Sequence, residues 1–144
     1  PLVAANWKMN GSFSMLDTML EFLRKNSENT PCQVVICPPH VLLSSLKKSV
    51  EGSGIEVGAQ NVHSELSGAF TGETSAPLLK ECGVKFCIVG HSERRKLFDE
   101  SDQFIRSKTE TLLRNGIRPI LCVGESLEQR SSGNHEDVVT RSIT

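Results

Sequence analysis

The stretch "KFCIVGHSERRKLFDES" (residues 85–101) is the part of the sequence that points most directly to the fold. It begins with a short apolar run, turns at Gly90, and then places His91 next to a serine, a carboxylate and two arginines. An apolar run that ends at a glycine is typical of a buried strand, and "SERRKLF" after it suits a short helical turn. The stretch therefore predicts an imidazole at the carboxyl end of a strand, where a helix begins.

The same kind of apolar run occurs five times: "LVAA" (2–5), "QVVIC" (33–37), "IEVGA" (55–59), "FCIVG" (86–90) and "PILCVG" (119–124). Continuous rather than alternating apolar residues are typical of parallel strands that are covered on both faces. Helix patterns lie between the runs, including one with Ser14 as its expected N-cap and one from about Ser101 to Asn115. Strands that alternate with helices predict an α/β fold with a parallel sheet and right-handed crossovers.

Two architectures are compatible with five strand–helix units. A doubly wound, flavodoxin-like sheet would be complete at 144 residues. Alternatively, the units could be the first part of a (β/α)8 barrel, which typically takes about 250 residues. Periodicity alone does not decide between them.

The composition argues against several classes of function. With 16 Lys and Arg residues against 17 Asp and Glu, the chain lacks the basic excess of a protein that binds nucleic acid or an acidic membrane. Its longest apolar runs have five or six residues, too few to span a bilayer, and its start does not resemble a signal peptide. The five cysteines form no C-x-x-C pair, so we expect reduced thiols in a cytoplasmic, globular protein.

Polar residues follow every predicted strand, at the end where parallel α/β folds carry their chemistry. They are Asn6 and Lys8, His40, Gln60 and Asn61, His91 and Glu93, and Glu125. Because the carboxyl ends of parallel strands meet at one end of a sheet, we expect these groups to converge on a single site. Amides and cations are as frequent among them as carboxylates, which favours a small, polar, anionic ligand.

Lys8 and His91 carry most of this interpretation. A lone lysine after a strand is most often a solvated loop charge, but beside Asn6 and His91 a lysine that holds substrate is the better hypothesis. N–H groups at the start of a helix disfavour the charged form of His91, so a neutral ring could donate a hydrogen bond to a carbonyl oxygen. The alternative is a histidine that only caps the helix or packs in the core. Glu93 and the two arginines after it predict, on their own, an exposed ion-pair cluster.

Other kinds of chemistry find little support in the sequence. The four histidines lack the spacing of metal ligands, and no stretch matches the P-loop or the dinucleotide-binding fingerprint. No serine lies on a G-x-S-x-G elbow. We therefore expect neither a metal nor a cofactor. The connection 60–75 is unusually long for one strand–helix unit, and such loops tend to be functional.

Six motifs together suggest a family: "AANWKMNGS" (4–12), "ICPP" (36–39), "GAQNV" (58–62), "GAFTGETS" (68–75), "IVGHSERR" (88–95) and "ILCVGE" (120–125). In their order and spacing, the chain resembles the triosephosphate isomerase family over all 144 residues. The resemblance implies the (β/α)8 TIM barrel, with only about five of its βα units in this sequence. Residues 1–144 would then be the N-terminal part of a single barrel domain.

The resemblance also implies a reaction and its residues. It implies an aldose–ketose isomerase of glycolysis and gluconeogenesis that interconverts dihydroxyacetone phosphate and D-glyceraldehyde 3-phosphate through an enediolate. Asn6 and Lys8 fall on the substrate-binding positions of the family. His91 falls on its electrophilic histidine, and Glu93 on a carboxylate close to the lysine. This family is itself the standard example of a neutral catalytic imidazole, so the neutral ring is taken over from it.

The loop at 60–75 has a counterpart in the family as well. It resembles a loop that enters the pocket of a partner subunit, with Phe70, Thr71 and Gly72 near its tip. The resemblance therefore implies a homodimer in which these three residues lie at the interface.

One departure from the family pattern bears on activity. The family's general base is a glutamate in a "Y-E-P-x-W-A-I-G-T-G" segment after the sixth strand, and the 144 residues contain no such segment. We therefore expect isomerase activity of the complete protein and none of this chain alone. Two alternatives remain: a non-catalytic structural fragment that docks with a complementary half-barrel, and another sugar-phosphate barrel enzyme such as an aldolase.

Overall fold

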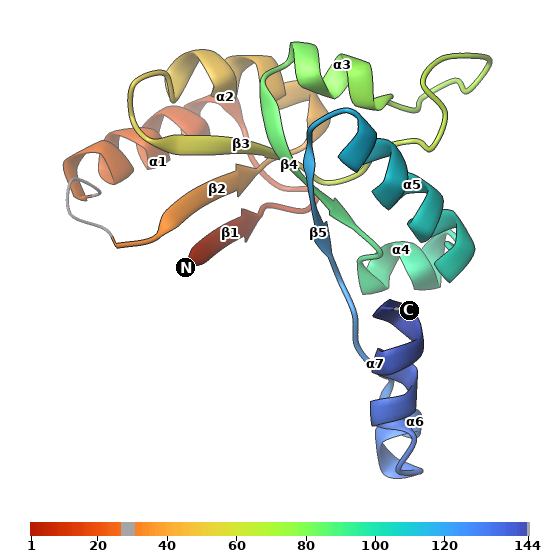
Figure 1. The fold of residues 1–144 in the computed structure, drawn as a ribbon. Helices are drawn as coiled ribbons and strands as arrows, with labels where there is room; N and C mark the ends of the chain where they lie inside the picture. Colours follow the sequence, from red (N-terminus) through yellow and green to blue (C-terminus); the bar gives the residue numbers. More distant parts are fainter. Residues whose placement is uncertain (27–30, 144) are drawn as a thin grey trace.

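The computed structural model describes residues 1–26 and 31–143, except for the side chains of Arg24 and Asn26. Five strands form one sheet in which all neighbours are parallel: β1 (Leu2–Asn6), β2 (Gln33–Cys37), β3 (Ile55–Ala59), β4 (Val84–Val89) and β5 (Arg118–Leu121) (Figure 1). Their spatial order β1-β2-β3-β4-β5 follows the sequence. A doubly wound sheet would reverse its strand order at a switch point, so that alternative is excluded. The sheet curls into part of a (β/α) barrel.

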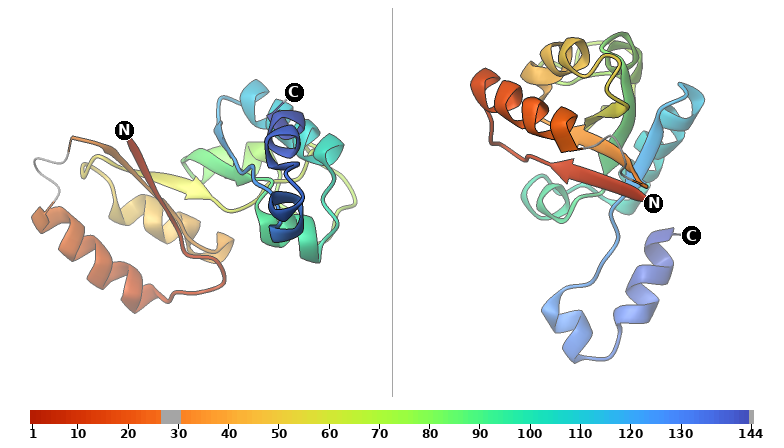
Figure 2. Two further views of the ribbon diagram at one scale, coloured as in Figure 1. Left: turned by 90° about the horizontal axis from the view of Figure 1, so that it is seen from below. Right: turned by 90° about the vertical axis from the view of Figure 1, so that its left-hand side faces the viewer.

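The helices follow the strands in the alternation that the sequence predicts. They are α1 (Phe13–Asn26), the 3₁₀ turn η1 (His40–Leu42) with α2 (Leu43–Ser49), α3 (Ala76–Glu81), α4 (Ser92–Leu97), α5 (Asp102–Arg114), α6 (Leu127–Ser131) and α7 (His135–Ile143). The pair α6 and α7 stands off from the rest of the chain (Figure 2). The sequence did not predict α6, which begins with a capping box between Ser126 and Gln129.

Several element boundaries differ from the prediction, and the clearest differences are at the start of α1 and the end of β5. Ser14 is not the cap of α1: the hydroxyl of Ser12 accepts the backbone N–H of Met15 at 3.1 Å, and the helix begins at Phe13. The fifth strand is also shorter than predicted, because β5 ends at Leu121. Both errors concern which of several suitable residues ends an element, a choice that local composition leaves open.

Apolar side chains pack on both faces of the sheet. The larger cluster lies between the strands and helices and includes Leu20, Leu46 and Leu112, whereas a smaller one on the other face contains strand residues such as Phe86 and Ile88. Gly58 lies on this second face, where a Cβ atom would come within 2.3 Å of the Cys37 sulfur. Glycine is therefore required there by close approach of the neighbouring strand.

The cysteines form no disulfide and are all free. Cys37 and Cys87 are buried, and burial raises the pKa of Cys37 to about 12 and that of Cys87 further. These two thiols are therefore protonated packing groups at neutral pH, as the sequence predicts.

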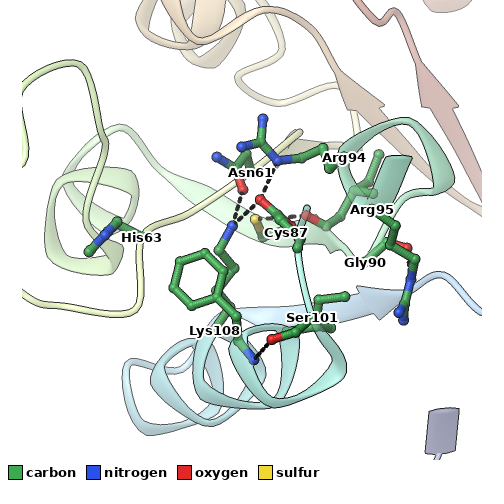
Figure 3. Close-up of polar contacts among 12 residues, drawn as sticks. Asn61, His63, Cys87, Gly90, Arg94, Arg95, Ser101 and Lys108 are labelled. Atoms are coloured by element: carbon green, nitrogen blue, oxygen red, sulfur yellow. Dashed lines mark hydrogen bonds and ion pairs between the residues drawn. The ribbon is translucent and has the colours of Figure 1, made fainter. Parts of the chain in front are cut away.

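A buried ion pair joins the end of β3 to α4 and α5. The ammonium of Lys108 donates to Glu100 Oε1 at 2.6 Å and to Asn61 Oδ1 at 2.9 Å, and Arg94 Nε donates to the same Glu100 oxygen at 2.6 Å (Figure 3). The side chains of Lys108 and Glu100 are only 1% and 3% exposed. Burial opposes the ionisation of Glu100, but the hydrogen bonds from Lys108 and Arg94 outweigh it and hold the pKa of that carboxyl below its usual range.

The exposed ion-pair cluster predicted for Glu93 and its neighbours does not form. Arg94 turns inward to Glu100, while Arg95 binds Asp102 and the carbonyl oxygen of Gly90. The prediction failed because neighbouring residues on the short helix α4 point in different directions and meet partners from elsewhere in the chain.

The Lys108→Met substitution tests how far the fold depends on this buried pair. We expect it to lower the free energy of unfolding by about 3–5 kcal/mol, because it leaves the Glu100 charge buried with a single cationic partner. Urea unfolding at neutral pH measures the change. Lys96→Met on the exposed side of α4 is the matched control and should stay within about 0.5 kcal/mol of the unsubstituted chain. An equal effect of the two substitutions would contradict the importance of the pair.

Candidate active site

A cleft of about 550 Å³ lies at the carboxyl ends of four strands. It is lined by residues that follow β1, β2, β3 and β4, among them Asn6, Lys8, His40, Gln60, His91 and Glu93. The prediction that residues after all five strands converge is wrong for Glu125, whose carboxylate lies 2.7 Å from Arg130 Nη1. β5 ends early, at Leu121, and α6 begins soon after it. Arg130 of α6 therefore lies close enough to bind the Glu125 carboxylate, and this side chain does not line the cleft.

Lys8 lies in a backbone conformation that few residues other than glycine adopt, with φ of 53°. The strained turn is held from both sides. Asn6 Oδ1 accepts the Lys8 backbone N–H at 2.9 Å, and Gln60 Nε2 donates to the Lys8 carbonyl oxygen at 2.9 Å. The same Gln60 nitrogen also donates to the carbonyl oxygen of Cys37 at 2.8 Å. Side chains from the ends of β1 and β3 thus fix where the lysine leaves the backbone, and such strain is common at functional sites.

The ammonium of Lys8 is paired with Glu93. Its Nζ atom lies 2.6 Å from Glu93 Oε1, and the side chains are 51% and 49% exposed. The hydrogen bond from Lys8 lowers the pKa of the Glu93 carboxyl. Because both partners face solvent, the attraction between them is screened. An anion that enters the cleft can therefore compete for the ammonium.

His91 occupies the N-cap position of α4, and its Nδ1 atom accepts the backbone N–H of Glu93 at 3.2 Å. The capping histidine that the sequence left as an alternative is thus found in the structure. A nitrogen that accepts a hydrogen bond carries no proton, so a neutral ring in this arrangement keeps its proton on Nε2. Capping and donation therefore use different atoms of the ring, and the two roles are compatible.

Together, these groups form a site suited to negative charge. Lys8 supplies an ammonium from the first βα unit, and His91 supplies a ring N–H from the fourth, both at the wall of one cleft. Fixed donors and cations of this kind stabilise an oxygen atom on which charge develops during a reaction.

His40 is a residue of the cleft to which the sequence assigned no chemistry. Its Nδ1 atom lies 3.2 Å from Thr74 Oγ1, and burial lowers the pKa of its ring. The signal in the sequence was the Pro38–Pro39 pair, which ends β2 and turns the next residue toward the cleft. Gln60 was identified only as an amide near the site, because its two bonds to other strand ends depend on tertiary structure.

The 60–75 loop extends from the body of the molecule beside α3 (Figure 1). Phe70 stacks on His63 with ring centroids 4.2 Å apart, and 43% of its surface remains exposed. Thr71 is exposed, and Gly72 is exposed and is one of the residues that line the cleft.

Neither a metal centre nor a membrane span emerges from residues 1–26 and 31–143. No group of three or more His, Cys, Asp or Glu side chains in these residues is arranged to hold a metal ion. Among the helices described here, none has both the length and the apolar composition for a bilayer crossing.

Comparison with known proteins gives a consistent assignment. The family model "Triosephosphate isomerase" matches residues 1–144. Similar curated proteins named triosephosphate isomerase include those of Enterobacter cloacae (48% identical over 144 residues) and Photorhabdus laumondii subsp. laumondii (47% over 144), which match 99% of this chain and 56% of their own length. That of Clostridium novyi (strain NT) is 44% identical over 142 residues, which are 99% of this chain and 57% of the relative.

The chain thus spans a little over half the length of the curated relatives that it matches. The match extends along the whole of the chain, from the strained turn at Lys8 to the region beyond β5. The chain belongs to the triosephosphate isomerase family.

Proposed function

We propose that this chain forms the charge-stabilising part of an enzyme that interconverts dihydroxyacetone phosphate and D-glyceraldehyde 3-phosphate. The observation that carries the proposal is the position of Lys8 and His91, which come from different βα units and line one cleft. Removal of a proton next to a carbonyl group gives an enediolate, whose oxygen bears negative charge. The Lys8 ammonium and the His91 N–H would stabilise that oxygen, while Asn6 and Glu93 would hold and orient Lys8.

Exposure of Lys8 limits what this arrangement achieves by itself. Two unit charges about 4 Å apart attract by roughly 1 kcal/mol in water but by roughly 4 kcal/mol at the effective dielectric constant of a partly buried protein site. Half of the Lys8 side chain is exposed to water. The ammonium would therefore stabilise a bound anion strongly only when another part of the protein covers the cleft and excludes water.

The proton itself must be removed by a base that the 144 residues do not supply. The glutamate of the family motif is not in this sequence, and Glu93 is already bound to Lys8. We therefore propose activity for the complete protein, without a metal or cofactor, and no activity for this chain alone. The free thiols support a cytoplasmic location, because disulfides are rare in that compartment.

A second candidate function is that of a structural half that docks with a complementary half-barrel. It is supported by the edges of the sheet, since within residues 1–26 and 31–143 the strands β1 and β5 each pair with a strand on one side only. On α1, Phe13 and Phe22 are also 61% and 64% exposed. Unpaired strand edges and exposed aromatic side chains favour association with another segment.

Reconstitution tests the proposed reaction. The 144-residue chain is mixed with a separately produced C-terminal portion of the Photorhabdus laumondii relative, of which the chain covers 56%. We expect isomerisation of glyceraldehyde 3-phosphate only in the mixture, because each half lacks part of the site. Native mass spectrometry reports whether the halves associate. Association without any isomerisation would support the structural half and contradict the catalytic proposal.

The role of His91 can be measured in the reconstituted enzyme. We expect His91→Phe to lower kcat by at least about 10²-fold, the usual effect of losing one donor to a developing oxyanion. His135→Phe, in α7 and outside the cleft, should leave kcat unchanged. Turnover that is undiminished in His91→Phe would remove His91 from the mechanism.

We also propose that the complete protein is a homodimer joined through the 60–75 loop. Support comes from the exposure of Phe70 and Thr71 on a loop that extends from the body of the molecule (Figure 1). In the family pattern, Phe70, Thr71 and Gly72 would contact the partner subunit.

Sedimentation of the reconstituted protein tests the dimer. Phe70→Asp should shift the protein from dimer to monomer at micromolar concentration, because it places a charge in the expected apolar contact. Leu127→Asp is the matched control, since Leu127 is 84% exposed on α6. A Phe70→Asp protein that remains dimeric would place the interface elsewhere.

A further inference from the structure

A histidine that the proposed reaction does not use lies at the base of the 60–75 loop. His40 begins η1 and lines the wall of the cleft. Its Nδ1 atom is 3.2 Å from Thr74 Oγ1. Thr74 lies in the outgoing arm of the loop, which is the part that leads into α3; the incoming arm is the part that follows β3. The carbonyl oxygen of Thr74 accepts the backbone N–H of His63 at 2.9 Å, and this bond joins the outgoing arm to the incoming arm. His40 therefore contacts the loop at the point where its two arms meet.

The other ring nitrogen of His40 is in an unusual position. Nε2 is shielded from solvent, and no hydrogen bond of normal geometry reaches it from the described residues. Burial lowers the pKa of His40, and the positive charge of Arg94 acts in the same direction. The backbone of Asn61 and the carboxylate of Glu73 favour the charged ring but do not outweigh these effects.

Other charged groups line the same cleft. Lys8 and Glu93 are paired with each other, and His91 is bound to the start of α4. Among the charged groups that act on the His40 ring, Glu73 lies on the loop and Arg94 on α4.

We propose that His40 is a proton-operated anchor for the 60–75 loop. As a neutral ring it holds the outgoing arm through Thr74. When the ring gains a proton, its positive charge lies in a position that is shielded from solvent, where the bonds that the ring makes do not offset the loss of hydration. The ring then moves out to solvent, and the arm at Thr74 separates from the end of β2. This device requires no substrate and is independent of the isomerase activity proposed above.

The direction of the pH effect follows from proton linkage. A ring that has left its buried position binds a proton with the ordinary histidine pKa of about 6.5. The buried ring has a lowered pKa, so the released form of the loop binds more protons. The anchored form therefore keeps its full stability above about pH 6.5 and loses stability as the pH falls below that value. Between about pH 7.5 and pH 5.5, the opening equilibrium should shift by up to about tenfold.

Amide hydrogen exchange of the 144-residue chain measures this opening directly. The reporter is the His63 amide, since its hydrogen bond to Thr74 breaks when the arms separate. Its protection factor, corrected for the intrinsic exchange rate, is divided by that of the Ile36 amide in β2, which reports opening of the core. We expect this ratio to fall up to about tenfold between pH 7.5 and pH 5.5. A ratio that does not change with pH would overturn the proposal.

Two variants identify the titrating group. His40→Asn keeps a polar side chain that cannot titrate, so the ratio should become independent of pH. His135→Asn, in α7, is the matched control and should retain the full response. The His63 ring also accepts a bond within the loop, from the Glu65 backbone N–H at 3.1 Å. A pH response that persists in His40→Asn would assign the effect to His63 or to another group and overturn the role of His40.

Thr74→Val gives an independent check that does not alter the histidine. It removes the hydroxyl that meets Nδ1 while keeping the backbone bond to His63. We expect lower protection of the His63 amide at pH 7.5 and a weaker response to acid. Unchanged protection at pH 7.5 would show that the side-chain contact does not anchor the loop.

Discussion

A carboxylate and an ammonium that are both removed from water hold the framework around the cleft. Glu100 and Lys108 are stable in their buried position only as a pair, because a single buried charge costs several kcal/mol. Since Arg94 and Asn61 bind to the same pair, the start of α4, the end of β3 and α5 take fixed positions relative to one another. His91 caps α4, so its place at the cleft is set in part by the Glu100–Lys108 pair, which does not itself line the cleft.

A second constraint acts at the other wall of the cleft. The left-handed turn at Lys8 is unfavourable by itself, and the hydrogen bonds from Gln60 and to Asn6 stabilise it. One amide nitrogen of Gln60 bonds to the ends of both β1 and β2. The position of the ammonium thus depends on three neighbouring strands, and the parallel sheet is what brings their ends together.

The sequence was informative where local chemistry decides the structure. Continuous apolar runs predicted the strands because a sheet covered on both faces requires them, and Gly90 with "SERRKLF" predicted the turn into α4. The direction of each side chain was harder to predict. Arg94 could bind a neighbour or a buried carboxylate, and only packing decides between them. Glu125 was predicted to line the cleft because the ends of parallel strands converge. The sequence did not predict α6, and it is Arg130 of this helix that binds Glu125. His40 was expected near the site but was given no role, because a histidine after two prolines has no motif of its own.

The order of the strands has a consequence for how the molecule is made. Each strand pairs with the one that precedes it in the sequence, so the sheet can grow one unit at a time while the chain leaves the ribosome. Contacts between successive units are short in sequence, which favours rapid assembly. The bond between Lys8 and Glu93 is different, since it joins residues 85 positions apart. During synthesis, the lysine must therefore wait for the fourth unit before it meets its carboxylate, and the surface of the cleft forms later than the scaffold that carries it.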